Sequence, residues 1–211
     1  MQAGYSALAI ALAYLIGSVS FAVLTSRLFG LPDPRSFGSK NPGATNVLRT
    51  GNRLAASLTL LGDGAKGWLA VYIAKAFAAR YTLGDETVAL AALAVVIGHI
   101  YPLFAGFVGG KGVATIFGVL LALSPWLGLA VIATWLLAAW MWRTSSLSAL
   151  IAAGFAPMYA FALFGVARYT LLTIILVSIL VWRHKENIRN LIERREGAIG
   201  KPPKPGDMPP E

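Results

Sequence analysis

The chain has 211 residues, of which 57% are hydrophobic and 13% charged, and this composition is far from that of a soluble domain. It contains no cysteine, which excludes disulfides, thiolate nucleophiles and cysteine metal sites. Its acidic residues are scattered and it has two histidines, so we expect no metal and no cofactor. In a membrane protein, an excess of basic residues such as this net charge of +9 mostly sets the orientation of the chain across the membrane. Nucleic-acid binding would need a soluble basic domain, and none is visible in the sequence.

Six apolar segments follow one another along the chain, at 5–29, 54–79, 87–104, 113–142, 147–164 and 169–182. The segment 113–142 is long for one crossing, and Ser124-Pro125 near its middle offers a turn. A single crossing would put the basic loop 30–53 and the basic C-terminal tail on opposite sides, against the positive-inside rule. We therefore predict an all-α integral membrane protein with seven transmembrane helices, a periplasmic N-terminus and a cytoplasmic C-terminus.

The end of the chain differs from everything before it. Residues 197–211 combine proline, glycine and charge without periodicity, which is typical of a disordered segment. We predict one transmembrane domain over residues 1–196 and a disordered cytoplasmic tail over 197–211.

The first polar segment, FGSKNPGATNVLRTGNR at 37–53, is long for a connecting loop. Its glycines allow close backbone approach and its other side chains offer neutral and cationic hydrogen bonds, which suits a polyol that carries a phosphate. A basic loop that only fixes orientation is the alternative for its cations. The candidate binding residues are Gly38, Ser39, Lys40, Asn41, Gly43, Thr45, Asn46 and Arg49.

Two charged residues stand inside the second apolar segment. Asp63 and Lys66 are three residues apart, so they can form an ion pair on one helical face. Charges at membrane depth usually face the bundle interior or a wet cavity, so we include both among the residues that shape the site. A purely structural pair is the alternative.

The second polar segment, GHIYPLFAGFVGGKGVAT at 98–115, places a glycine-rich turn before an apolar helix. Backbone amides and a helix N-terminus can hold phosphate there, although the spacing is not that of a Walker A motif. A tight turn that needs glycine for steric reasons is the alternative. The candidates are Gly109, Gly110, Lys111 and Gly112, with His99 as a further site residue or an interhelical hydrogen-bonding residue.

The third polar segment, RHKENIRNLIERRE, begins at Arg183, where the last apolar segment ends. His184 and Asn187 are three residues apart and project from one helical face, where they can orient hydroxyls or take a proton. A basic helix that contacts anionic lipid is the alternative, and we prefer it for Arg194 and Arg195.

Together, GSKNPGATN at 38–46, GHIYPLF with GGKGVAT at 98–115, and HKENI at 184–188 resemble the bacterial membrane acyl-phosphate:glycerol-3-phosphate acyltransferases. The resemblance covers most of the chain. Val108, Asn190 and Arg194 depart from the family pattern, which often has a basic residue, an arginine and a glycine at these positions.

The resemblance implies an activity, substrates and a location. The family transfers a fatty acyl group from acyl phosphate to the 1-hydroxyl of glycerol 3-phosphate. The products are lysophosphatidate and inorganic phosphate, at the start of phospholipid synthesis. The partners would be these two substrates and membrane lipids, with no nucleic acid. We expect a multi-pass protein of the bacterial inner membrane whose active site faces the cytoplasm.

An acyl phosphate is already activated, so neither a metal nor an enzyme nucleophile is chemically required. The glycine turn with Lys111 would hold the phosphate of the donor, and Lys40 and Arg49 that of the acceptor. The glycerol hydroxyls would be oriented by Ser39, Asn46, His184 and Asn187. We predict Ser39, Lys111, His184 and Asn187 as catalytic residues. The resemblance implies that a phosphate oxygen of the substrate is the base, with His184 as the alternative.

A transporter of a phosphorylated solute is the rival function, because glycines and cations at membrane depth also build anion pathways. Two features argue against it. All three motif segments fall on one predicted side of the membrane, and no inverted repeat is visible. A prenyl-phosphate transferase would be expected to carry Asp-rich metal sites.

Overall fold

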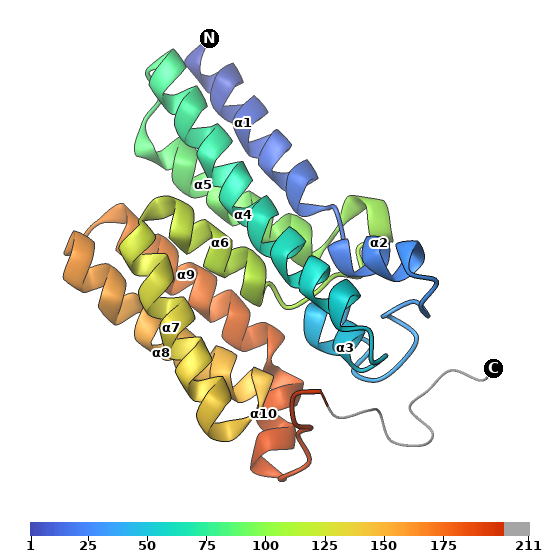
Figure 1. Cartoon of the computed structure of the whole chain (residues 1–211). Helices are drawn as coiled ribbons and strands as arrows, with labels where there is room; N and C mark the ends of the chain where they lie inside the picture. Colours follow the sequence, from blue (N-terminus) through green and yellow to red (C-terminus); the bar gives the residue numbers. More distant parts are fainter. Residues whose placement is uncertain (201–211) are drawn as a thin grey trace.

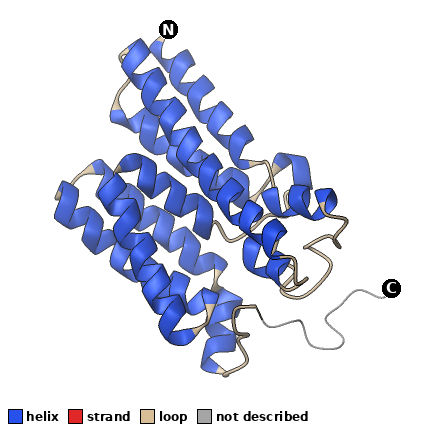
Figure 2. Cartoon of the chain, in the orientation of Figure 1, coloured by secondary structure: helices blue, strands red, loops and turns tan. Residues whose placement is uncertain are grey.

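The computed structural model describes residues 1–200, and every regular element in that range is helical (Figure 2). The all-α prediction is therefore confirmed for these residues. The tail predicted from 197 onward lies mostly outside the described residues, which end at 200. The elements are α1 Gln2–Gly17, α2 Phe21–Leu28, α3 Ala44–Leu48, α4 Arg53–Tyr81, α5 Asp85–Ile100, the 3-10 helix η1 Leu103–Ala105, α6 Val113–Leu123, α7 Pro125–Trp142, α8 Ser145–Phe164, α9 Arg168–Arg183 and α10 Lys185–Ile192.

Membrane-crossing length is clear for some of these helices. Asp85–Ala105, Pro125–Trp142 and Ser145–Phe164 are long and apolar enough to cross, and α1 with α2 adds a fourth if this pair, bent by 40°, is one broken span. α6 has 11 residues and α9 has 16, while α4 has 29 but carries Asp63, Lys66 and Lys75 within its length. The seven crossings predicted from charge asymmetry thus stay a prediction.

The predicted turn at Ser124-Pro125 is present. Ser124 ends α6 and caps α7, its hydroxyl accepting a hydrogen bond from the Leu127 amide at 3.4 Å, and Pro125 is the first residue of α7. Proline suits this position because its missing amide would have no partner within the helix. The two helices pack against each other and run in opposite directions (Figure 1).

The first apolar segment, by contrast, is not one straight helix. It breaks between α1 and α2, which frees backbone carbonyls from helical hydrogen bonds. The carbonyl of Val19, in the break, accepts a hydrogen bond from Lys66 Nζ at 2.7 Å. The break thus lets a buried lysine on α4 find a backbone partner.

Glycines let the central helices approach closely. A Cβ on Gly17 or Gly98 would overlap the backbone where α1 meets α5, and one on Gly67 or Gly118 would overlap the backbone where α4 meets α6. Small residues at such contacts are typical of helix packing in membranes. The outer faces carry exposed apolar side chains, including Leu61, Trp140, Met158 and Leu171, as expected where lipid is the solvent.

The polar segments gather at one end of the bundle. Figure 1 shows α2, α3 and α10 toward that end and the N-terminus at the other. The chain between α5 and α6, which contains the glycine turn, also reaches this end. The packing of the helices thus brings together three segments that are far apart in the sequence.

Candidate functional site

The glycine turn lies between η1 and α6. The amide of Gly110 donates to the carbonyl of His99 at 3.2 Å, and a Cβ on Gly109 or Gly110 would overlap the backbone or ring of His99. Gly112, with φ of 86°, is the N-cap residue of α6, and no side chain caps that end. Glycine is sterically required here, and the same geometry leaves first-turn amides of α6 available for an anion.

Lys111 projects from this turn to the helix that follows α9. Its Nζ donates to Asn187 Oδ1 at 2.6 Å, so two predicted catalytic residues are in direct contact. Burial lowers the pKa of the Lys111 ammonium, while the nearby carboxylates of Glu196 and Glu186 act in the opposite direction. A partly desolvated cation beside free amides is a strong site for phosphate.

His184 occupies the junction between α9 and α10 and is 2% exposed. Its Nδ1 lies 2.8 Å from the carbonyl oxygen of Leu180. A carbonyl only accepts, so Nδ1 carries the proton and Nε2 is left as an acceptor. Burial lowers the pKa of His184 to about 4, and the imidazole is therefore neutral at physiological pH.

Beyond Asn187, the hydrogen-bond chain continues to two residues that sequence reasoning did not select. Glu196 Oε1 accepts from Asn187 Nδ2 at 2.7 Å and from Ser146 Oγ at 2.6 Å. No spacing rule joins these residues, because Glu196 follows α10 and Ser146 belongs to α8. The sequence hinted only at Glu196, which directly follows Arg194 and Arg195 in a chain with few acidic residues.

Arg183, the first residue of the third polar segment, was also not among the predicted site residues. Its Nη2 donates to the carbonyls of Gly109 and Gly110 at 3.3 and 3.2 Å. It therefore holds the backbone of the glycine turn and adds positive charge near Lys111.

The loop before α4 is organised by Asn46, which is 2% exposed. Its Nδ2 donates to the carbonyls of Pro34 and Phe37 at 2.7 and 3.1 Å. Its Oδ1 accepts from the amide of Ser39 at 3.1 Å and from Arg49 Nη1 at 3.5 Å. The amide of Asn46 is thus used inside the loop, where it places Ser39 and Arg49.

Other predicted residues of this loop lie around Asn46. Gly38 has φ of 56°, and Asn46 and Arg49 occupy the space that a Cβ on it would need. Ser39 and Lys40 are exposed, and Lys40 also has a left-handed backbone. Gly43 packs against the Asn41 side chain, and Thr45 Oγ1 lies 3.0 Å from Ser145 Oγ at the start of α8.

The loop also meets the glycine turn. The carbonyl of Pro42 lies next to Gly110, at 3.0 Å from the position of a Cβ there. Arg49 is close enough to Lys111 to lower the pKa of its ammonium. All three polar segments therefore lie close together at this end of the bundle.

The remaining predicted site residues, Asp63, Lys66 and His99, lie inside the bundle. Lys66 Nζ is 2.8 Å from Asp63 Oδ1, and both side chains are almost fully buried. His99 Nδ1 is 3.5 Å from Asp63 Oδ1 and 3.2 Å from Thr115 Oγ1. Asp63 contacts both of the other residues, and the His99 ring also lies against Gly110, so this cluster supports the turn from within.

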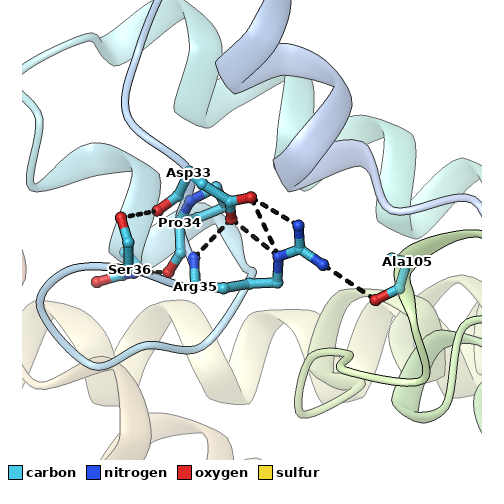
Figure 3. A network of polar contacts seen from close by, with 6 residues as sticks. Asp33, Pro34, Arg35, Ser36 and Ala105 are labelled. Carbon is cyan, nitrogen blue, oxygen red and sulfur yellow. Dashed lines mark hydrogen bonds and ion pairs between the residues drawn. The ribbon is translucent and has the colours of Figure 1, made fainter.

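A second group of polar contacts that holds the site lies on the loop after α2 and joins Asp33, Arg35 and Ala105 (Figure 3). Arg35 Nε and Nη2 donate to Asp33 Oδ1 and Oδ2 at 2.9 and 2.6 Å, and Arg35 Nη1 donates to the carbonyl of Ala105 at 3.0 Å. The Arg35 guanidinium lowers the pKa of the Asp33 carboxyl. Arg35 thus ties the loop just before the first polar segment to η1 in the second.

Within residues 1–200, no group of three or more histidine, aspartate or glutamate side chains is arranged to hold a metal ion. What the site does contain is a cation, amides at a helix N-terminus, a neutral imidazole acceptor and an oriented amide. These groups can bind phosphates and align a hydroxyl.

Comparison with known proteins identifies one family. The family described as "Glycerol-3-phosphate acyltransferase" matches residues 7–194. Proteins of that name from Thiobacillus denitrificans and a Janthinobacterium species are 57% and 58% identical over 189 and 188 residues, covering 90% and 89% of this chain and 94% of each relative. The crystal structure of PlsY, an integral membrane glycerol 3-phosphate acyltransferase in its glycerol 3-phosphate form, is 34% identical with a TM-score of 0.85, covering 92% of this chain and 95% of that one.

Proposed function

Because the chain belongs to the glycerol-3-phosphate acyltransferase family, we propose that the glycine turn, Lys111 and Asn187 form the centre of its active site. The chain is an integral membrane enzyme that transfers an acyl group to glycerol 3-phosphate, an activity of phospholipid biosynthesis. The transporter alternative is thereby set aside. The observation that carries the site assignment is the 2.6 Å contact between Lys111 and Asn187 beside the uncapped start of α6.

The donor in this proposal is acyl phosphate. A glycine turn, free helix amides and a partly buried lysine suit a phosphate whose negative charge grows as it leaves. Purified protein in lipid should release inorganic phosphate in proportion to lysophosphatidate when acyl phosphate and glycerol 3-phosphate are supplied. Activity with an acyl thioester but not with acyl phosphate would contradict the donor assignment.

In the reaction, the 1-hydroxyl oxygen of glycerol 3-phosphate bonds to the acyl carbon. The bond from that carbon to the phosphate oxygen breaks, and the hydroxyl proton passes to the departing phosphate. Lys111 and the amides of the turn stabilise the leaving phosphate, and Lys40 and Arg49 bind the phosphate of the acceptor. Ser39 and Asn187 orient the hydroxyls, while Asn46 holds the loop that presents Ser39.

His184 aligns a hydroxyl through Nε2 in this proposal rather than serving as the base. Its burial and lowered pKa, about 4, make its imidazole a weak base. A phosphate oxygen of the substrate is then the better proton acceptor.

Transfer to an enzyme serine is not needed, so mass spectrometry of enzyme incubated with acyl phosphate alone should detect no acyl adduct on Ser39. Such an adduct would overturn direct transfer.

The chemistry also requires no divalent metal, because the donor is pre-activated. Acyl transfer should continue at its normal rate in EDTA. Loss of activity that a specific metal restores would contradict this mechanism.

We further propose seven crossings of the bacterial inner membrane, with the N-terminus periplasmic and the active site and C-terminus cytoplasmic. Support comes from the basic residues near α2, α3 and α10, which share one end of the bundle. Reporter fusions after Arg183 should give a cytoplasmic signal. A periplasmic signal would refute this orientation.

A further inference from the structure

Glu196 is brought to the site by the way α10 ends. The helix stops at Ile192, Arg194 adopts a left-handed φ of 55°, and the amide of Arg195 donates to the carbonyl of Asn190 at 2.7 Å. This turn reverses the chain so that Glu196 returns to Asn187 on α10. Farther on, the amide of Ile199 donates to the carbonyl of Arg143 at 2.8 Å and anchors the segment.

The two partners of Asn187, Glu196 and Lys111, determine which way its side-chain amide faces. Glu196 Oε1 accepts from Asn187 Nδ2, so Asn187 Oδ1 is left to accept from Lys111 Nζ. An ionised carboxylate only accepts and an ammonium only donates, so the opposite orientation of the amide would lose both hydrogen bonds. Ser146, donating to the same carboxylate oxygen, holds Glu196 from the side of α8.

From this geometry we propose that Glu196 is a positioning residue for acyl transfer, which orients the Asn187 amide and through it the ammonium of Lys111. The inference rests on the proposed phosphate-binding role of Lys111. A neutral amide between the carboxylate and the ammonium holds Lys111 in place without a direct ion pair. The cation therefore stays available to a substrate phosphate.

A carboxylate near an anion site could instead compete with substrate. Competition would require Glu196 to form direct ion pairs with the cationic side chains of the site. Its hydrogen bonds among residues 1–200 run to the neutral groups of Asn187 and Ser146, and the ion pairs of that part of the chain do not include it. The two roles predict opposite effects when the carboxylate is removed.

The test compares Glu196→Ala with Glu196→Gln, measuring kcat and KM for glycerol 3-phosphate at saturating acyl phosphate. We expect kcat/KM of Glu196→Ala to fall about 10- to 100-fold, because Lys111 and Asn187 lose their alignment. Glu196→Gln retains an oxygen acceptor and should recover most of this loss. Glu193→Ala, which removes a carboxylate that pairs with Arg189 at 3.5 Å, is the matched control and should leave kcat/KM unchanged.

A double-mutant cycle separates positioning from a general effect on the fold. If Glu196 acts through Asn187, the variant with both residues changed to alanine should be no slower than Asn187→Ala alone. Additive losses would overturn the proposal, and so would a lower KM or higher rate for Glu196→Ala. If Lys111→Ala and Asn187→Ala themselves have normal rates, the proposed site fails. If they are slow and Glu196→Ala is not, this inference alone fails.

Discussion

Lys66 and Lys111, each with its polar partners, differ in whether the ammonium contacts a carboxylate directly. Lys66, deep in the bundle, contacts the carboxylate of Asp63 directly at 2.8 Å and a backbone carbonyl at 2.7 Å. Lys111, at the polar end, contacts the neutral amide of Asn187, and the carboxylate of Glu196 lies one residue farther along the chain of hydrogen bonds. Because the Lys66 ammonium is neutralised by a buried carboxylate in direct contact, its charge stabilises the fold and does not bind a ligand. An intervening amide leaves the charge of Lys111 for a ligand.

Burial explains why the two arrangements are not interchangeable. An unpaired charge among apolar helices is costly, so Lys66 needs its counter-ion at all times. Lys111 lies in a half-buried loop, where water or substrate can complete its partners. The comparison therefore predicts stability effects at Lys66 and catalytic effects at Lys111.

The largest effect is expected from Lys66→Ala. This change leaves Asp63 buried without its ammonium partner and should lower the free energy of unfolding by about 3–5 kcal/mol. Chemical unfolding in detergent measures it. The double variant Asp63→Ala with Lys66→Ala should be more stable than Lys66→Ala alone. If the two losses add instead, the pair is not the source of the effect.

Lys111→Ala should affect the reaction rather than the fold. Losing the cation that we propose stabilises the departing phosphate should reduce kcat about 10²- to 10³-fold. Thermal unfolding should shift little, in contrast to Lys66→Ala. Lys185→Ala, which removes an exposed lysine at the start of α10, is the control for loss of positive charge. A normal rate for Lys111→Ala would return the glycine turn to a purely steric role.

The buried imidazole at the polar end gives a pH-dependent test. The folded-state pKa of His184, about 4, lies below its ordinary value of 6.5, so the unfolded chain binds more protons between these values. The stability that the neutral ring contributes is fully present above about pH 6.5 and is lost as pH falls toward 4. Ring-labelled NMR, with His184→Gln to identify the signal, should show a neutral, Nδ1-protonated ring down to about pH 5.5. A titration midpoint near 6.5 would be inconsistent with the buried geometry.

The smallest effect concerns the turn that carries Glu196. Arg194 has a left-handed backbone at φ of 55°, which glycine adopts without the clash of a Cβ. Arg194→Gly should therefore raise the free energy of unfolding by about 0.5–1 kcal/mol with activity retained. Arg195→Gly, at a position without positive φ, is the matched control and should not be stabilising. Equal effects of the two changes would point to charge rather than backbone conformation.

The polar segments show how much of the candidate site could be predicted from the sequence. It identified the segments around Ser39, Lys111 and His184, because glycines, amides and charges stand out against apolar surroundings. It assigned Asn46 to substrate hydroxyls, whereas the amide of Asn46 makes its hydrogen bonds inside the loop. A side chain's type indicates what it can bind, but its neighbours decide what it does bind.

By itself, the sequence determined the helical segments, the turn at Ser124-Pro125 and the grouping of the polar motifs. Lipid forces the backbone to form its hydrogen bonds within helices, so apolar length and proline position predict these features locally. Tertiary structure alone decided the break before α2, the Arg183 contacts with the glycine turn, and the link from Ser146 through Glu196 to Asn187. Those features depend on backbone and side-chain atoms that meet only after distant helices pack, and no local period or spacing encodes such meetings.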